Sequence, residues 1–205
     1  MTGVAARMWA EQHRDDGGRR RLFEAVAGAR PAASVLYPGS YVDLAPSFVF
    51  PHVTYVDFDP RTPTFFADRA GIAEILDVED PADRLEFIFA DYTDDLPLAD
   101  QHFDLLVSLY AGFVSEACTQ YLRVGGTLLV NPSHGDAAMA SIDPRYQLVG
   151  VVTSRDDRCR VRTEDLETYL VPTTPVELTP EYLHRRRRGI AYTRAPLAYL
   201  FERIF

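Results

Sequence analysis

Short apolar runs alternate with segments of helical spacing over residues 34–131. The runs are rich in β-branched and aromatic residues and are bounded by Pro, Gly or Asp, a pattern that predicts strands. Nearly continuous apolar character is typical of parallel strands that helices cover on both faces. The alternation therefore predicts an α/β fold with a doubly wound sheet. The five predicted strands are 34–37, 53–56, 85–90, 103–109 and 127–130.

The segments before and between these strands predict helices. Residues 4–28 carry apolar positions at helical spacing, interrupted at Asp15-Asp16-Gly17-Gly18. They predict two hinged helices, which either pack on the sheet or cover a substrate. Three more helices are expected: one between Asp43 and Pro51, one over 64–76, and one over 115–122 with Gly125-Gly126 as its stop.

The pattern is weaker beyond Pro132. A short helix is expected over 137–142 and a strand over 147–153, with 158–162 as a hairpin partner across Asp156-Asp157. Residues 163–170 fit either a continuing strand or a helix, and the helical spacing favours the helix. A proline in the first turn predicts terminal helices over 180–188 and 196–204.

Nothing in the sequence divides the chain into separate domains. We expect one domain over 1–205, with N-terminal helices in 1–30, a core in 34–153 and a C-terminal extension in 154–205. Two cysteines in a chain of ordinary domain size, with no export signal at its start, favour a cytoplasmic location. No apolar stretch is long enough to span a membrane, so a membrane protein is not expected.

The charge of the chain argues against some classes of partner. The formal net charge is −9 and every basic side chain other than histidine is arginine. This balance argues against general binding of nucleic acid or membrane surfaces. Arg185, Arg186, Arg187 and Arg188 form the one basic run. The run either balances acidic surface or docks an acidic or phosphate-bearing partner, for which arginine suits bidentate contacts.

Glycine and aspartate at the ends of the first two predicted strands give the best functional clue. Gly39 lies in the turn after the first strand, and Asp57 ends the second strand 18 residues later. A separation of about 20 residues is expected between a ligand-cradling turn and an acid that binds ribose. Ligands of parallel sheets lie outside the carboxyl ends of the strands. These two residues therefore predict a site at that edge.

Five segments in order resemble the class I S-adenosylmethionine-dependent methyltransferases. They are VLYPG, VTYVDFD, FIFADYTDDLPLADQHFDLLVS, the helix that follows, and YLRVGGTLLV. The resemblance covers about residues 30–131, and more loosely the strand over 147–153. It implies a three-layer αβα sandwich with a Rossmann-like sheet of about seven mostly parallel strands, the last antiparallel.

The resemblance also implies roles for residues that match the family's motifs. Asp57 would accept hydrogen bonds from both ribose hydroxyls, and Asp91 would receive the adenine amino group. Gly39 would let the backbone approach the cofactor closely. Ser108, at the end of the fourth strand, would face the methionine portion. The full set of implied cofactor-binding residues is Tyr37, Gly39, Ser40, Asp57, Phe58, Asp91, Tyr92 and Ser108.

The turn after the first strand departs from the family's pattern. The family usually has an acid followed by three glycines at alternate positions. Here Tyr37 stands at the acid position, and Tyr41 and Asp43 stand at the second and third glycine positions. Their side chains are expected to compete with a ligand for this space.

Candidates for chemistry beyond cofactor binding are few. His134 follows the fifth strand, where it could take a proton from a substrate, or it is a surface histidine. Tyr110 could orient a substrate or belong to the core. The remaining histidines show no metal-ligand spacing with one another or with the cysteines, so no metal site is expected.

Two main functions remain open from the sequence. The first is a methyltransferase that uses S-adenosylmethionine and acts on a small molecule. The second is a non-catalytic relative that keeps the sheet for binding or interaction. A site for another adenosine-containing ligand is a third possibility, and the fold alone does not choose among them.

Overall fold

Five parallel strands form the larger part of one central sheet. The structure is a computed structural model, and it describes residues 3–12 and 17–205. The parallel strands pair side by side, so their carboxyl ends meet at one edge. All five sequence-predicted strands are confirmed, and they are β1 (Ser34–Pro38), β2 (His52–Asp57), β3 (Leu85–Phe89), β4 (Phe103–Ser108) and β5 (Leu122–Val130).

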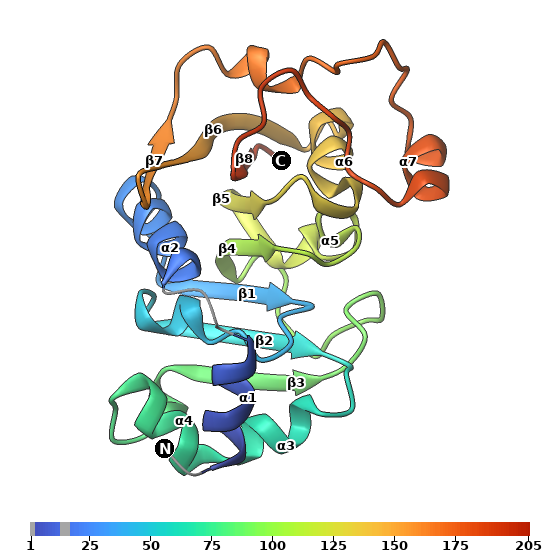
Figure 1. Ribbon diagram of the computed structural model, residues 1–205. Helices are drawn as coiled ribbons and strands as arrows, with labels where there is room; N and C mark the ends of the chain where they lie inside the picture. The colour runs from blue at the N-terminus through green and yellow to red at the C-terminus, as the bar shows by residue number, and fades with distance from the viewer. Residues whose placement is uncertain (1–2, 13–16) are drawn as a thin grey trace.

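The C-terminal residues complete the sheet. Three strands, β6 (Tyr146–Arg155), β7 (Arg158–Arg162) and β8 (Ala198–Arg203), extend the order to β3-β2-β1-β4-β5-β8-β6-β7. β8 lies between β5 and β6 and is antiparallel to both (Figure 1). The segment 154–205 therefore supplies an interior strand of the sheet.

The helix expected over 196–204 is wrong, because β8 occupies that segment. Ala198, Tyr199, Leu200 and Phe201 are all buried. Four consecutive buried residues show neither the helical nor the alternating period, so spacing alone does not separate a short buried strand from a helix.

The predicted hairpin between β6 and β7 is confirmed. Asp156 and Asp157 connect the strands, and both have positive φ angles of 50° and 57°. Two such residues form the tight turn that matches the twist of paired strands. Residues 163–170 contain only the 3-10 turn η5 (Leu166–Leu170), whereas α7 (Pro180–Arg186) begins with its proline as expected.

Helices cover both faces of the sheet, which confirms the three-layer arrangement (Figure 1). α2 packs through Leu22, Phe23 and Val26, as expected for a helix lying on the sheet. The Asp15-Asp16 part of the predicted hinge lies outside the described residues. One face carries α1 (Val4–Gln12), α2 (Gly18–Ala29), η1 (Ala45–Phe48), α3 (Thr62–Ala67) and α4 (Arg69–Leu76); the other carries α5 (Val114–Ala117), α6 (Asp136–Ile142) and α7.

Two predicted helices are shorter than expected, and a third is divided in two. The helix between Asp43 and Pro51 is only the 3-10 turn η1. The helix over 64–76 is broken at Asp68, whose side chain accepts hydrogen bonds from the N–H groups of Gly71 and Ala5. The helix over 115–122 is the single turn α5 followed by η3 (Thr119–Tyr121). Gly125, with φ of 79°, lies inside β5 and stops no helix.

The position of β8 predicts how its residues contribute to stability. Leu200 is 1% exposed in this interior strand, whereas Leu197 just before the strand is 40% exposed. Leu200→Ala should lower the free energy of unfolding by about 2–5 kcal/mol, because it leaves a cavity in the core. Urea unfolding measures this, with Leu197→Ala as the matched control. Equal effects of the two substitutions would contradict the buried position of β8.

Candidate functional site

The turn after β1 is built around Gly39. We call residues 38–43 the glycine turn. Gly39 has a φ of 65°, and its N–H donates to the carbonyl of Val56 at 2.8 Å. A Cβ at this position would lie 2.8 Å from the Cβ of Ala111, closer than side-chain atoms pack. Glycine is therefore required both by the left-handed backbone and by the close approach.

Asp57 faces this turn from the end of β2. Its side chain is buried, with the residue only 7% exposed. One carboxylate oxygen accepts from the N–H of Tyr41 at 2.7 Å, and the other accepts from the N–H of Asp59 at 2.7 Å. Each oxygen has a second lone pair. The carboxylate is thus fixed in place and keeps the capacity to accept two more hydrogen bonds.

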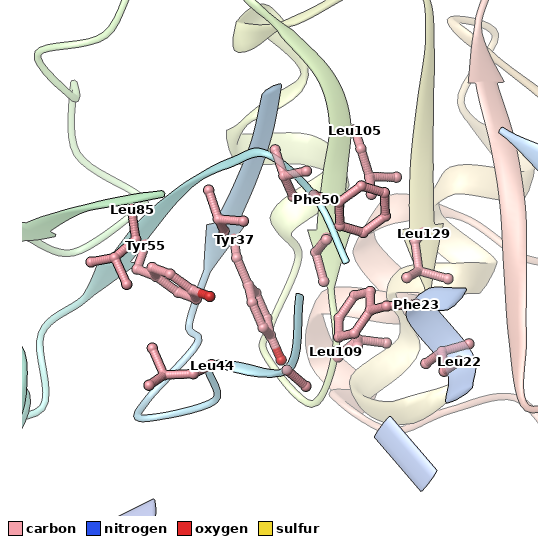
Figure 2. Close-up of a cluster of buried hydrophobic side chains, with 14 of the residues drawn as sticks. Leu22, Phe23, Tyr37, Leu44, Phe50, Tyr55, Leu85, Leu105, Leu109 and Leu129 are labelled. Atoms are coloured by element: carbon pink, nitrogen blue, oxygen red, sulfur yellow. The ribbon is translucent and has the colours of Figure 1, made fainter. Parts of the chain in front are cut away.

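The residues that depart from the family's turn pattern do not share one environment. Tyr37 is buried, and its ring packs in the core beside Tyr55 and Phe23 (Figure 2). Its hydroxyl donates to Asp43 at 3.1 Å, and Arg19 of α2 pairs with the same carboxylate at 3.3 Å. Burial and the neighbouring Asp43 raise the pKa of Tyr37 well above its usual value. The Tyr37 and Asp43 side chains therefore bind each other in the core.

Tyr41 lies on the outer side of the glycine turn. Its φ is 49°, an uncommon conformation for a residue with a Cβ. The guanidinium of Arg61 lies 4.7 Å from the centre of the Tyr41 ring. Arg61 also binds both carboxylate oxygens of Asp59, which lowers the pKa of Asp59 to about 2. Tyr41 thus stacks under a cation beside Asp57.

The loop after β4 lies directly on the glycine turn. We call residues 109–113 the post-β4 loop. Ala111 contacts Gly39, and the Tyr92 ring also lies close by: its Cε1 would be 3.8 Å from a Cβ at position 39. The Tyr92 hydroxyl accepts from the N–H of Gly112 at 3.0 Å, and Tyr110 lies under the guanidinium of Arg19 at 5.0 Å. A ligand that follows the turn from β2 toward β4 meets Ala111 and Tyr92.

A buried carboxylate anchors both ends of this loop. Asp136, in the first turn of α6, accepts hydrogen bonds from the hydroxyls of Ser108 and Ser115, each at 2.5 Å. The N–H of Ser115 also donates to it. Burial raises the pKa of Asp136 to about 6, although the serine hydrogen bonds oppose the shift. The sequence does not point to Asp136 as a site residue, since its only feature there is an acid at the start of a predicted helix.

Two further predicted cofactor residues, Asp91 and Phe58, lie at the rim of the site, whereas Ser40 lies inside the glycine turn. Asp91 accepts two hydrogen bonds from Thr93 on one carboxylate oxygen, and within the described residues its other oxygen has no partner. Phe58 is 60% exposed beside Asp57. Ser40 is buried, and its hydroxyl donates to the Tyr41 carbonyl at 3.4 Å. Asp91 and Phe58 thus give the rim a carboxylate and an exposed aromatic surface.

A cavity of about 530 Å³ adjoins the post-β4 loop. Its lining includes Gly112 of the post-β4 loop, Tyr92, which lies next to the glycine turn, and His134. His134 is exposed, and its Nδ1 shares a hydrogen bond with Ser133 at 2.6 Å. Tyr110 is 61% exposed and does not line this cavity. The other lining residues include Phe113, Glu116, Ala117, His184 and Arg187.

The structure thus brings together Gly39, Asp57 and Tyr92, and it adds Ala111 and Asp136. His184 of α7 and Arg187, the residue after this helix, also line the cavity, a position that the sequence did not predict. The part of the chain that the structure describes contains no cluster of His, Cys, Asp or Glu able to hold a metal ion. Across the same residues, no helix has the length and apolar character to cross a membrane.

Comparison with known proteins identifies the fold. No protein-family model and no curated protein matches this sequence. The solved structures that match include cofactor-bound Rv0187 from MTB, with 20% identity, a TM-score of 0.55, and coverage of 77% of this chain and 84% of that one. An O-methyltransferase from Bacillus cereus in complex with SAH matches at 12% identity and a TM-score of 0.53, covering 77% and 84%.

A third match is the O-methyltransferase TomG from Streptomyces achromogenes, involved in tomaymycin synthesis and solved in complex with SAM. Its identity is 14% and its TM-score is 0.51, with coverage of 78% of this chain and 88% of that one. The chain therefore has the Rossmann-like fold of the SAM-dependent methyltransferases, as the sequence segments predicted.

Burial of Asp136 predicts a pH dependence of stability. Between pH 4 and 6 the folded chain keeps this carboxyl protonated, whereas the unfolded chain, with a pKa near 3.8, ionises it. The unfolded state therefore binds fewer protons, and the contribution of Asp136 to stability falls as pH rises through this window. The Asp136→Asn substitution removes this loss of stability with rising pH, because asparagine does not ionise.

The unfolding free energy of the Asp136→Asn variant, relative to wild type, should thus rise by about 2 kcal/mol from pH 4 to pH 7. Urea unfolding at several pH values measures the difference, with the same substitution at exposed Asp100 as control. A difference that stays constant with pH would contradict the burial of an ionisable Asp136.

Proposed function

We propose that this chain binds S-adenosylmethionine at the carboxyl ends of β1 and β2 and transfers its methyl group to a small molecule. The observation that carries the proposal is the buried Asp57 carboxylate, fixed beside the left-handed Gly39 at the edge where parallel strands end. A fixed carboxylate with free lone pairs suits a ribose diol, which donates two hydrogen bonds.

The residues at the rim fit the adenosine half of this cofactor. The unpartnered oxygen of Asp91 is able to accept a hydrogen bond from the adenine amino group. Exposed Phe58 offers an apolar surface for the purine ring. Asp57 would hold the ribose between them. Three residues on the ends of two adjacent strands thus match the three parts of adenosine that need binding.

The methionine half needs space that the post-β4 loop now occupies. Ala111 lies on Gly39, and the hydroxyl of Ser108 is bound to Asp136. We infer that residues 109–113 move away from the glycine turn when the cofactor binds. The loop contains Gly112 and exposed Tyr110, and only part of it is buried, which makes such a movement feasible.

The adjoining cavity supports a small-molecule acceptor. When bound, the cofactor supplies both the methyl group and its leaving group. The chain then has to orient the acceptor and exclude water. A cavity of about 530 Å³ is in the usual range for small-molecule sites. His134 in its lining would accept a proton from the acceptor heteroatom. Two of the structural neighbours, TomG and the Bacillus cereus protein, are O-methyltransferases, which agrees with this proposal.

Two observations favour a second function, a non-catalytic binding protein. The contact between Ala111 and Gly39 closes the glycine turn, and η1 replaces a full helix after it. If the loop does not move, the chain keeps the sheet without the cofactor. A ligand that contains adenosine alone would need only the rim.

Titration with S-adenosylhomocysteine tests these alternatives. We expect micromolar binding by calorimetry. Asp57→Ala should weaken binding roughly 100-fold, because two hydrogen bonds to a charged group are lost. Asp59→Ala is the matched control, since it keeps the backbone N–H that binds Asp57, and it should change the affinity about 3-fold at most.

Three outcomes would overturn parts of the proposal. Absence of binding at millimolar ligand would exclude the cofactor and leave the non-catalytic function. Binding of adenosine without binding of S-adenosylhomocysteine would assign the rim to another adenosine ligand. Equal affinity of wild type and Asp57→Ala would place the ligand elsewhere. Circular dichroism of each variant verifies that it folds.

A further inference from the structure

Arginines cover one face of β7, the outermost strand of the sheet. Arg158, Arg160 and Arg162 alternate with Cys159 and Val161, which pack against the core on the α2 side. Successive side chains of a strand point to opposite faces. The three arginines therefore share the other face and are all exposed.

The pairing of β7 with β6 adds a fourth arginine to this face. Arg155 lies directly opposite Arg158, and Thr153 lies opposite Arg160. These residues and Asp156 line a groove of about 520 Å³. We call Arg155, Arg158, Arg160 and Arg162 the arginine face.

A second hollow of about 320 Å³ continues the groove. It shares Arg160 and Arg162 with the first and extends to Arg194. Arg194 is held in place by hydrogen bonds to the hydroxyls of Thr168 at 2.6 Å and Tyr169 at 2.7 Å. The basic surface is therefore longer than β7 itself.

Little negative charge balances the arginine face. Asp156 Oδ2 lies 3.6 Å from Arg155 Nε, but both side chains are about nine-tenths exposed. An ion pair this exposed is weak. Glu164 and Asp165 line only the second hollow. Among the described residues, the guanidinium groups of Arg158, Arg160 and Arg162 have no ion pair, hydrogen bond or ring contact. Like charges on neighbouring positions of a sheet repel, so an outside anion would stabilise this face.

The free edge of β7 indicates which kind of anionic partner fits this face. β7 pairs with β6 on one side, and the described residues pair with no backbone on its other side. An edge strand presents unpaired N–H and C=O groups, which another extended chain is able to use. Alternate residues of any strand are about 6.6 Å apart, so acidic residues at alternate positions of a second strand match the arginine spacing. Nucleic acid supplies negative charge, but it has no peptide backbone to pair with the edge of β7.

We propose that β7 is a docking strand for an extended acidic segment of a partner protein. The segment pairs with the free edge of β7 and places Asp or Glu at alternate positions against Arg158, Arg160 and Arg162. Backbone pairing then supplies affinity and the alternating charges fix the register. This surface lies on a different part of the sheet from the glycine turn, so the inference does not depend on the proposed function.

A peptide in which glutamate alternates with threonine tests this inference by fluorescence anisotropy. We expect it to bind the full chain and to bind more weakly as salt increases. The R158Q/R160Q/R162Q variant should lose affinity about 10-fold or more, since three cross-strand charge pairs are removed. The matched control R185Q/R186Q/R188Q removes the same charge from the C-terminal basic run and should bind as wild type does.

Two further peptides separate strand pairing from simple charge attraction on the unmodified protein. One has the same composition with its glutamates in a block, and the other has alternate backbone nitrogens methylated. We expect both to bind at least about 10-fold more weakly than the alternating peptide. Equal binding of either peptide would overturn strand pairing. If the alternating peptide does not bind at all, the docking proposal is wrong, and the arginines only protect the edge of β7 from unwanted pairing.

Other occupants of the arginine face give distinct results. Tighter binding of a single-stranded oligonucleotide than of the peptide would overturn the protein partner. Sedimentation that shows self-association of wild type, lost in R158Q/R160Q/R162Q, would assign the face to a second copy and also overturn it. Equal peptide affinity of this variant and wild type would place the peptide elsewhere.

Discussion

The buried carboxylate of Asp57 is the constraint from which the candidate site follows. A charged group that is largely removed from water has to be hydrogen-bonded, and the N–H groups of Tyr41 and Asp59 meet this need. Tyr41 reaches Asp57 only if the chain turns sharply after β1, which Gly39 allows. The parallel pairing of β1 with β2 then places this arrangement at the edge where a ligand would lie.

Two other buried polar groups hold the surroundings of the site. Asp43, the last residue of the glycine turn, binds Tyr37 and Arg19, while Asp136 binds Ser108 and Ser115 at the two ends of the post-β4 loop. Such fully bonded groups specify one arrangement of the elements they join. They explain how a turn without the usual glycines keeps its shape, and why the loop rests on it.

Local patterns were enough to predict the parallel strands, the hairpin at Asp156-Asp157, and the positions of Gly39 and Asp57. They failed at β8, because its four buried residues have no period, and they did not show that Tyr37 points into the core. Ala111 and Asp136 enter the site through contacts between segments distant in sequence. The arginines of β7 are visible in the sequence, but only the register with β6 gathers four of them on one face.

A crystal structure of the chain with S-adenosylhomocysteine would test the central claim most directly. The account predicts ribose hydroxyls bound to the two oxygens of Asp57, adenine beside Phe58 and Asp91, and Ala111 moved away from Gly39. A structure at saturating ligand with Ala111 still on Gly39 and no nucleoside at Asp57 would contradict it.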